Sequence, residues 1–458
     1  MGYISHIKQT WEKLDESWRF AITIFLIART LYALWSWVVL TIQPAAVHYI
    51  EVEEKPAILF LDLYTNRTYT YFREIEQQAL EFKPAGINSV SDLQSSSLWD
   101  IRSGNSFQGP HMGKSLAPAT YSTEKMFTYF RASPYPHPLL AMWQRFDSNI
   151  YITIAENGYG QIAEDTHFPP LYPALIHLLS FVFGNAFLAG LFLSHTAILY
   201  SLKLMHEIFS QWGDPPTGKR AVAYLLLFPV AFFFFSVYSE SLFLMTVLLS
   251  MRAMSTRSWL WAGFWVFCAT LTRLTGLALI APLLYLMWKD QPFLRKLNHW
   301  IGIGIAGLAI LLYVFIRWTH LPQDALPLSE SSWYARLVWP WESYLHALEI
   351  LFSGHANYID ILNFVVAHLI IVLFILGLKI LPMEYNLYSA FTLLILFSRV
   401  VETKAYNSML RFSLTLFPMF FIIGMAGRDS RYQRIITYSF VCLNLFLSAE
   451  FFGWGWVA

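Results

Sequence analysis

The chain has few cysteines, few charged residues and no excess of either charge. Its 458 residues include two cysteines, Cys268 and Cys442, and 13% charged residues, of which 31 are basic and 30 acidic. Both cysteines lie in apolar stretches and are expected to pack as small hydrophobic residues, so the sequence predicts no disulfide and no thiolate metal site. Without a basic field the chain is not expected to bind nucleic acid.

Two further signatures are missing. The sequence has no cluster of histidine and cysteine at zinc spacing and no glycine-rich phosphate loop. We therefore predict no bound metal and no cofactor.

Apolar residues are abundant instead, at 56% hydrophobic and 18% aromatic. They recur in stretches of roughly 17–25 residues, a length that crosses a bilayer as a helix. This pattern excludes a soluble fold and predicts an all-α polytopic membrane protein with about 11 transmembrane helices. The expected spans lie near 20–42, 172–209, 219–237, 240–254, 258–272, 275–288, 298–317, 358–380, 385–400, 408–426 and 435–455.

Basic residues give these spans an orientation. Lys and Arg recur in short loops that can all lie on one side, which the positive-inside rule assigns to the cytoplasm. Within 172–209, one crossing preceded by an interfacial helix fits the charges better than two crossings. The predicted organisation is a cytoplasmic N-terminus (1–19), a retained first transmembrane helix (20–42), an extracytoplasmic loop with the catalytic motif (43–167), a transmembrane bundle (168–317), a second extracytoplasmic loop (318–357) and C-terminal transmembrane helices (358–458).

The large first loop contains the apolar segment 58–64 and a helix-like segment from Phe72 to Phe82. We expect it to form a cap of amphipathic helices over the membrane. Its end is the most informative part of the chain, because Arg145, Asp147 and Glu156 alternate with aromatic residues just before the chain re-enters the membrane near Phe168. An enzyme that acts on a membrane-embedded substrate would keep its base at such a place.

Charged residues also occur within or at the ends of the apolar spans. Glu240, Arg273, Arg399 and Arg411 are of this kind. Because charges are costly in a bilayer and are usually functional there, these residues are candidates for a site.

Several segments resemble, in order, those of the PIG-V family, the second mannosyltransferases of GPI-anchor assembly and their prokaryotic relatives. They are Arg145-Phe146-Asp147-Ser148-Asn149-Ile150-Tyr151 with Ile154-Ala155-Glu156-Asn157-Gly158-Tyr159, Phe168-Pro169-Pro170-Leu171-Tyr172-Pro173, the stretch 229–244 with Tyr238-Ser239-Glu240, Thr272-Arg273-Leu274-Thr275-Gly276, and Met409-Leu410-Arg411-Phe412-Ser413 with Phe417-Pro418. Two features depart from the family: Phe146 replaces the usual Trp, and the loop before Arg145 is longer.

The resemblance implies a GT-C-type fold and an inverting glycosyltransferase in the plasma membrane or endoplasmic reticulum. Such an enzyme transfers mannose from a polyprenyl or dolichyl phosphate donor to a glycolipid or glycan acceptor on the extracytoplasmic face. Asp147 would be the general base, with Glu156 the second catalytic candidate. The implied donor-phosphate ligands are Arg273, Arg411, Arg399 and Arg145, and the candidate substrate-binding residues are Tyr151, His167, Tyr172, Tyr238 and Glu240.

Other readings of the same residues stay open. Asp147 can simply cap the helix that starts at Ser148, Arg145 can be a surface charge, and arginines at helix ends can snorkel to the interface. Asp147 and Glu156 together can also hold a divalent ion. At the level of function, the alternatives are a transferase for another polyprenyl-phosphate sugar, a transporter or flippase, and a non-enzymatic subunit of a membrane complex.

Overall fold

The protein is described here from a computed structural model, in which the chain forms two compact units. The first takes in Met1–Arg29, Tyr151–Ser448 and Val457–Ala458, and the second takes in Thr30–Ile150 and Ala449–Trp456. The structure describes residues 11, 13–43, 45–52, 55–63, 67–72, 117–118, 129, 131–161, 165–290, 296–320, 335–354 and 356–457.

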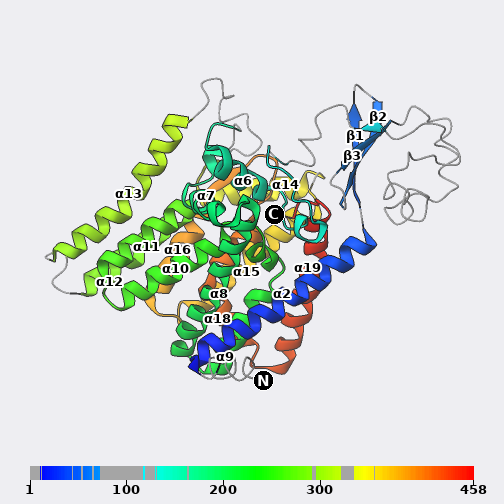
Figure 1. Ribbon diagram of the computed structural model, residues 1–458. Coiled ribbons are helices and arrows are strands. Elements are labelled where there is room, and N and C mark those ends of the chain that lie inside the picture. The colour runs from blue at the N-terminus through cyan, green and yellow to red at the C-terminus, as the bar shows by residue number, and fades with distance from the viewer. Residues whose placement is uncertain are drawn as a thin grey trace, which may run out of the picture. The chain divides into compact units, whose positions relative to one another are not determined.

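The first unit is built almost entirely of helices (Figure 1). In chain order they are α7 (Leu171–Phe183), α8 (Ala186–Trp212), α9 (Pro215–Leu227), α10 (Glu240–Ser255), α11 (Trp259–Thr272), α12 (Ile280–Lys289), α13 (Leu297–His320), α14 (Pro340–Phe352), α15 (Tyr358–Gly377), α16 (Met383–Phe397), α17 (Met409–Phe412) and α18 (Phe417–Ala426). Short 3-10 turns join some of them, namely η3 (Asp165–His167), η4 (Ala231–Phe235), η5 (Leu274–Leu279) and η7 (Ser413–Thr415). Three helices, α2 (Glu16–Ile42), α6 (Asp147–Asn157) and α19 (Ser430–Phe452), contribute residues to both units.

Five helices in the described part of the chain are long and apolar enough to cross a bilayer, namely α2, α8, α13, α15 and α19. A sixth candidate is the pair 409–415 and 417–426, which is bent by 88°. Shorter apolar helices occupy 171–183, 259–272 and 274–289. The chain therefore has the long apolar helices of a multi-pass membrane protein, but several predicted spans are shorter or interrupted.

The predicted stretch 172–209 forms a short helix followed by a long one. Gly184 ends α7 in the left-handed conformation at φ 65°, and the Asn185 side chain then caps α8 by accepting a hydrogen bond from the Leu188 amide at 3.0 Å. Glycine adopts this conformation without steric cost, and asparagine is a preferred N-cap. The stretch thus contains one candidate span and one shorter apolar helix, and the interfacial position of the short helix stays a prediction.

Polar residues start the next helices in the same way. Asp214 caps α9 by accepting from the Thr217 amide at 2.9 Å, with Pro215 in the first helical position. Hydrogen bonding to Thr217 lowers the pKa of Asp214 to about 2. At α15, Asn357 and Asp360 form a reciprocal capping box, so three boundaries in the bundle follow from local sequence.

Helices α11 and α13 touch at two glycines. A Cβ atom added to Gly263 would lie 2.1 Å from the carbonyl oxygen of Gly302, and one added to Gly302 would lie 2.6 Å from the Trp259 carbonyl oxygen. Only glycine permits such a close approach of two backbones, as is common where membrane helices cross. The opposite side of α13 exposes large apolar residues, including Leu311 and Trp318.

The described part of the first loop, in the second unit, contains strands where we had expected amphipathic helices. Strands β1 (Ala45–Val52), β2 (Lys55–Asp62), β3 (Arg67–Phe72) and β4 (Ala117–Pro118) form an antiparallel sheet in that order. The run Thr68-Tyr69-Thr70-Tyr71 explains the difference, because β-branched and aromatic residues favour a pleated strand. The helix predicted after Phe72 lies outside the described residues.

A second, two-stranded sheet belongs to the helical unit. Strand β5 (Ala335–Leu337) pairs antiparallel with β6 (Arg399–Val401), and Leu337 lies opposite Arg399. The pairing joins the segment before α14 to the segment after α16, although more than 60 residues separate them in the chain. It fixes the backbone of Arg399, one of the candidate site residues.

Candidate functional site

The structure brings four of the predicted charged residues together within the helical unit. Glu240 is the first residue of α10, Arg273 caps the C-terminus of α11, Arg411 lies in α17 and Arg399 lies in β6. We call these four residues the arginine cluster. All of them stand where a helix begins, ends or breaks, so their positions follow from the interruptions in the apolar spans.

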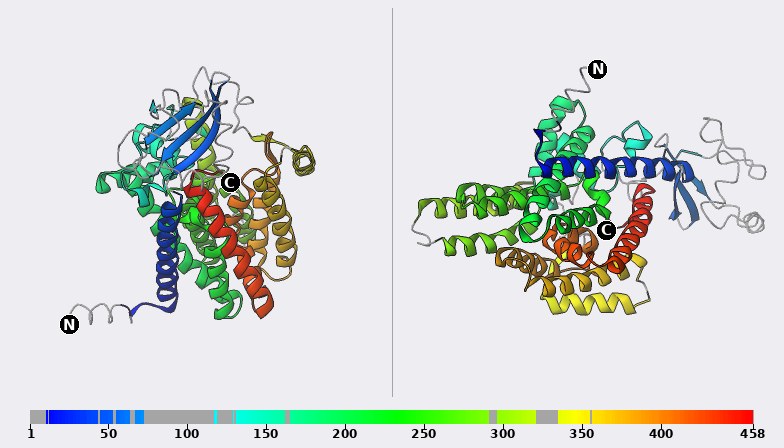
Figure 2. Two further views of the ribbon diagram at one scale, coloured as in Figure 1. Left: turned by 90° about the vertical axis from the view of Figure 1, so that its right-hand side faces the viewer. Right: turned by 90° about the horizontal axis from the view of Figure 1, so that it is seen from below.

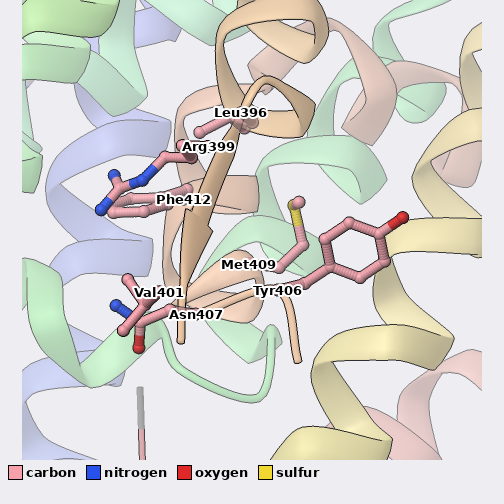
Figure 3. Close-up of a pocket in the computed structure, with 7 residues that line it drawn as sticks. All are labelled: Leu396, Arg399, Val401, Tyr406, Asn407, Met409 and Phe412. Atoms are coloured by element: carbon pink, nitrogen blue, oxygen red, sulfur yellow. The ribbon is translucent and has the colours of Figure 1, made fainter. Parts of the chain in front are cut away.

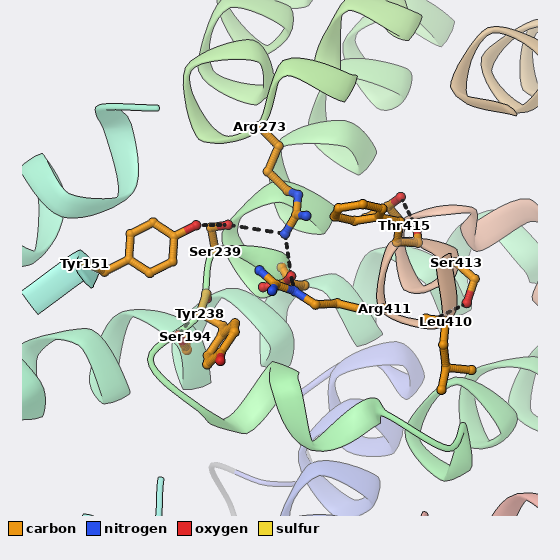
Figure 4. A network of polar contacts seen from close by, with 11 residues as sticks. Tyr151, Ser194, Tyr238, Ser239, Arg273, Leu410, Arg411, Ser413 and Thr415 are labelled. Carbon is orange, nitrogen blue, oxygen red and sulfur yellow. Dashed lines mark hydrogen bonds and ion pairs between the residues drawn. The ribbon is translucent and has the colours of Figure 1, made fainter. Parts of the chain in front are cut away.

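Glu240 is the centre of the cluster. Its carboxylate oxygen Oε1 accepts hydrogen bonds from Arg273 Nη1 and from Arg411 Nε (Figure 4). Glu240 is fully buried, and the side chains of Arg273 and Arg411 are only 12% and 8% exposed. A buried carboxylate is stable in its ionised form only when charges of this kind compensate it.

Aromatic rings support the guanidinium groups. Phe412 serves two of them, since the Cζ atoms of Arg273 and Arg399 lie 4.9 Å and 5.1 Å from the centre of its ring. Arg411 lies 4.8 Å from the ring centre of Tyr238. Such cation–π contacts stabilise arginine where water is scarce, and they also orient its planar fork.

Arg399 is the member of the cluster that borders a pocket. It lines a pocket together with Leu396, Val401, Tyr406, Asn407, Met409 and Phe412 (Figure 3). Because arginine keeps its proton in proteins, the cluster holds three positive charges against the one negative charge of Glu240.

A glycine, Gly276, allows the tight turn of the backbone that follows Arg273. After α11 ends, the chain turns back over the helix in η5, where a Cβ atom on Gly276 would lie 2.5 Å from the backbone of Ala269 and Thr270. No larger residue fits without moving that backbone. Gly276 therefore explains how Arg273 can end one helix and still lie against the next segment.

Two polar residues on α15 hold the segment that carries Arg411. Asp360 Oδ1 accepts from the Ala405 amide at 3.1 Å, and Asn363 Oδ1 accepts from the Leu410 amide at 2.9 Å. Sequence reasoning missed both residues. The available signal was their polarity, three residues apart, in an otherwise apolar span.

The candidate substrate-binding tyrosines are buried beside the cluster. Tyr151 donates its hydroxyl to Ser239 Oγ at 2.8 Å, and Ser239 in turn accepts from Arg273 Nη1 at 3.5 Å. Tyr172 is packed deeper, with its hydroxyl 2.7 Å from Ser194 Oγ and its ring 4.8 Å from that of Tyr151. The short path from Tyr151 to Arg273 includes Ser239, which the sequence analysis did not single out although it lies beside Glu240.

His167 has a different setting. It lies in η3 and is only partly buried. The loop before it is ordered by Asp165, whose Oδ2 accepts from the amides of Gly160 and Gln161 at 2.8 Å and 2.9 Å. Asp165 is a further residue that the motif did not reveal, because its partners are backbone groups.

Arg145 lies in the second unit and is fully buried. Its Nε donates to the carbonyl oxygen of Phe452 at 3.0 Å, its Nη1 donates to that of Ala141 at 2.6 Å, and its Cζ lies 4.8 Å from the ring centre of Trp454. Burial lowers the pKa of Arg145 to about 10. These contacts indicate that Arg145 ties the motif to the C-terminal segment, and the reading of Arg145 as a surface charge is wrong.

Asp147 begins α6 and is 5% exposed. The preceding residue, Phe146, has φ 48°, a left-handed conformation that is strained for a bulky side chain. The Phe146 ring packs on Phe451 and Trp454, with ring centres 6.1 Å and 5.4 Å apart. Strain of this kind is common at functional sites, where the surroundings must impose it.

Glu156, the second catalytic candidate, lies near the end of α6 and is exposed. Partial burial nevertheless raises its pKa above the ordinary value. Among the residues that the structure describes, no group of three or more His, Cys, Asp or Glu side chains is placed to hold a metal ion.

The chain matches no protein-family model, no curated protein and no solved structure. The functional inferences therefore depend on the geometry of the described residues and on the resemblance of the motifs.

Proposed function

We propose that the protein is an integral-membrane glycosyltransferase that uses a polyprenyl or dolichyl phosphate sugar as its donor. The observation that carries this proposal is the arginine cluster, in which three arginines and one glutamate meet at the helix breaks of an apolar bundle. Three positive charges less one negative charge leave a net charge of plus two. A concentration of charge this costly in an apolar environment favours an anionic substrate.

A lipid phosphate suits this charge. A sugar-bearing phosphate diester carries one negative charge, and the phosphate monoester that leaves carries up to two. The cluster would therefore bind the departing group more strongly than the intact donor, which is the condition for accelerating the reaction. Planar guanidiniums also match phosphate geometry better than lysine does.

Glu240 would position the arginines in this reaction. Two guanidiniums bond its Oε1 and stabilise the ionised form, which makes Glu240 a poor proton acceptor. A separate base must then take the proton of the acceptor hydroxyl, for which a well-placed carboxylate supplies about 10²–10⁴-fold in rate. The motif resemblance gives this role to Asp147, with Glu156 as the second candidate, and it makes mannose the first sugar to test.

The proposal includes a GT-C-type arrangement with about 11 crossings, in which the short helices α9 to α12 cross together with the 3-10 turns beside them. It also requires the motif 145–159 and the loop after α12 to lie on opposite sides of the membrane.

Single cysteines at the exposed positions Asn157 and Lys289, in a cysteine-free background, test this arrangement. An impermeant maleimide should label Asn157→Cys from outside and Lys289→Cys only after permeabilisation. Labelling of both from one side would contradict an outer-face transfer.

Donor binding tests the cluster itself. The affinity of the nanodisc-reconstituted protein for a polyprenyl monophosphate should fall by about 10-fold or more in Arg399→Gln, since a charge-assisted hydrogen bond of roughly 1.5–3 kcal/mol is lost. Affinity for the uncharged polyprenol should not change. The control is Arg336→Gln on the neighbouring strand, because the Arg336 side chain is 56% exposed. Equal affinities in Arg399→Gln and Arg336→Gln would remove the cluster from the donor site.

A transporter of lipid phosphates is the second candidate, because the pair 409–415 and 417–426 is bent by 88° and transporters often bind substrates at broken helices. The two functions differ in their products. A transferase releases polyprenyl phosphate from the donor in detergent solution, whereas a transporter moves the intact lipid between leaflets and leaves it unchanged.

A further inference from the structure

Helix α14 differs in direction from its neighbours in one view of the structure. In the left view of Figure 2 the gold helices α15 and α16 run vertically while α14 is seen end-on, and in the right view α14 is seen from the side. In the chain it stands between two candidate spans, α13 and α15. Helix α14 therefore ends only a few residues before a candidate span begins, a position typical of segments at the membrane boundary.

One face of α14 is fastened to strand β6. Ser343 donates its hydroxyl to the carbonyl oxygen of Arg399 at 3.2 Å, and the His346 ring nitrogen Nε2 lies 3.3 Å from the carbonyl oxygen of Val401. Ser343 and Ala347, one turn apart, are buried. This face is therefore fixed to the same backbone that presents Arg399.

The opposite face of α14 is apolar and exposed. Its exposed residues at helical spacing are Trp341, Leu345 and Phe352, with Leu348 half-buried among them, and Trp339 precedes them. The Trp339 and Trp341 rings stack with centres 5.0 Å apart and planes 5° apart. The exposed fractions are 63% for Trp339, 58% for Trp341, 61% for Leu345 and 85% for Phe352. We call these five residues the apolar ledge.

We propose that the apolar ledge is seated in the boundary between headgroups and acyl chains on the outer side of the bilayer. Tryptophan is enriched at this depth, and an amphipathic helix lying in the plane buries its apolar face there. The exposed carboxylates of Glu342 and Glu349 lie on the flank of the ledge, where they can remain in water. The exposed tryptophan pair and the candidate spans on either side of α14 in the chain therefore favour the bilayer over a second copy of the chain as the occupant.

The position of α14 at the membrane surface also affects the position of Arg399 in the candidate site. The ledge, β5 and β6 are joined by strand pairing and by the Ser343 hydrogen bond, so the depth of α14 sets the depth of Arg399 relative to the lipid headgroups. The membrane surface would then hold Arg399 at the level of lipid phosphates. This inference goes beyond the proposed function and does not depend on it.

Depth-dependent quenching tests the ledge in the full chain. Single cysteines at Leu345, Phe352 or Glu342, in a background lacking Cys268 and Cys442, are labelled with nitrobenzoxadiazole and the protein is reconstituted into phosphatidylcholine vesicles. Phospholipids with a nitroxide on acyl carbon 5 should quench the labels at 345 and 352 several-fold more than the label at 342. Aqueous iodide should show the reverse order.

Two results would overturn the inference. Iodide quenching at 345 and 352 as strong as at 342 would place the ledge in water. Protection of 345 and 352 from both quenchers would mean that protein covers the ledge, as in a dimer. Elution volume and thermal midpoint of each labelled protein, compared with the unlabelled chain, confirm that the variants are folded.

Discussion

Replacing Glu240 by glutamine removes the charge at the centre of the arginine cluster while keeping the size of the side chain. Glu240 is fully buried, and its two arginine partners are 12% and 8% exposed. Removing one partner of a buried ion pair costs about 3–5 kcal/mol, mostly because the remaining charge is left uncompensated. Glutamine keeps one acceptor oxygen, so we expect a loss near the lower end, about 3 kcal/mol.

The free energy of unfolding can be measured by titrating the purified protein with sodium dodecyl sulfate in mixed micelles. The matched control is Glu342→Gln on the exposed face of α14, which should change stability by less than about 0.5 kcal/mol. The two variants make the same chemical change in a buried and an exposed setting.

The same unfolding titration can be repeated with polyprenyl phosphate present. An anion that binds the cluster should stabilise Glu240→Gln at least as much as the wild type, because three arginines then face the phosphate alone. At 100 times the dissociation constant the gain is about 2.7 kcal/mol. If Glu240→Gln were as stable as Glu342→Gln, or gained nothing from the lipid phosphate, our account of the cluster would be refuted.

Two further variants test the supports of the bundle. Lys296 and Trp259 donate to Asp290 Oδ2 at 2.8 Å and 2.9 Å, and hydrogen bonding to Lys296 lowers the pKa of Asp290 to about 2. Because the folded pKa lies below the ordinary value of 3.8, Asp290 stabilises the fold fully above about pH 4, and the stabilisation disappears as the pH falls through about 2. Asp290→Asn should therefore lower the thermal midpoint at pH 7 and less at pH 3; an equal loss at both would contradict the assignment. Asn363→Ala leaves the buried amide of Leu410 without its acceptor and should cost about 1–3 kcal/mol, measured by the same micelle titration, whereas no loss would show that Asn363 does not hold the α17 segment.

The sequence predicted the members of the arginine cluster because a charge in an apolar span has few stable environments. Glu240, Arg273 and Arg411 are each costly alone, and pairing offsets that cost, so their meeting in space followed from the rule that made them candidates. Asp360 and Asn363 also stand out by their polarity in an apolar span, but their role could not be predicted from it. Their partners are backbone amides that the fold brings to them from more than 40 residues away, and such amides carry no sequence signal.

The first loop and the interrupted helices show a second limit. The expectation of amphipathic helices was wrong for 45–72, where β-branched and aromatic residues form strands. Hydropathy marks 408–426 as one span, but the chain bends there by 88° between Thr415 and Phe417. The break immediately precedes Pro418, which lacks the amide hydrogen that a continuous helix requires. Arg145 matched its motif by sequence, yet its burial against Phe452 depends on a segment at the other end of the chain.

The most direct test of the account is the release of polyprenyl phosphate by the purified protein. Wild-type protein and Asp147→Asn are incubated with polyprenyl-phosphate mannose, glucose, galactose and an aminosugar, with total membrane lipids as the source of acceptor. We predict that the wild type releases polyprenyl phosphate from one of these donors, with mannose first in order. Asp147→Asn should lose at least about 100-fold in rate and keep nearly the same thermal stability. Absence of release from every donor would contradict the glycosyltransferase proposal, and undiminished release by Asp147→Asn would contradict the choice of Asp147 as base.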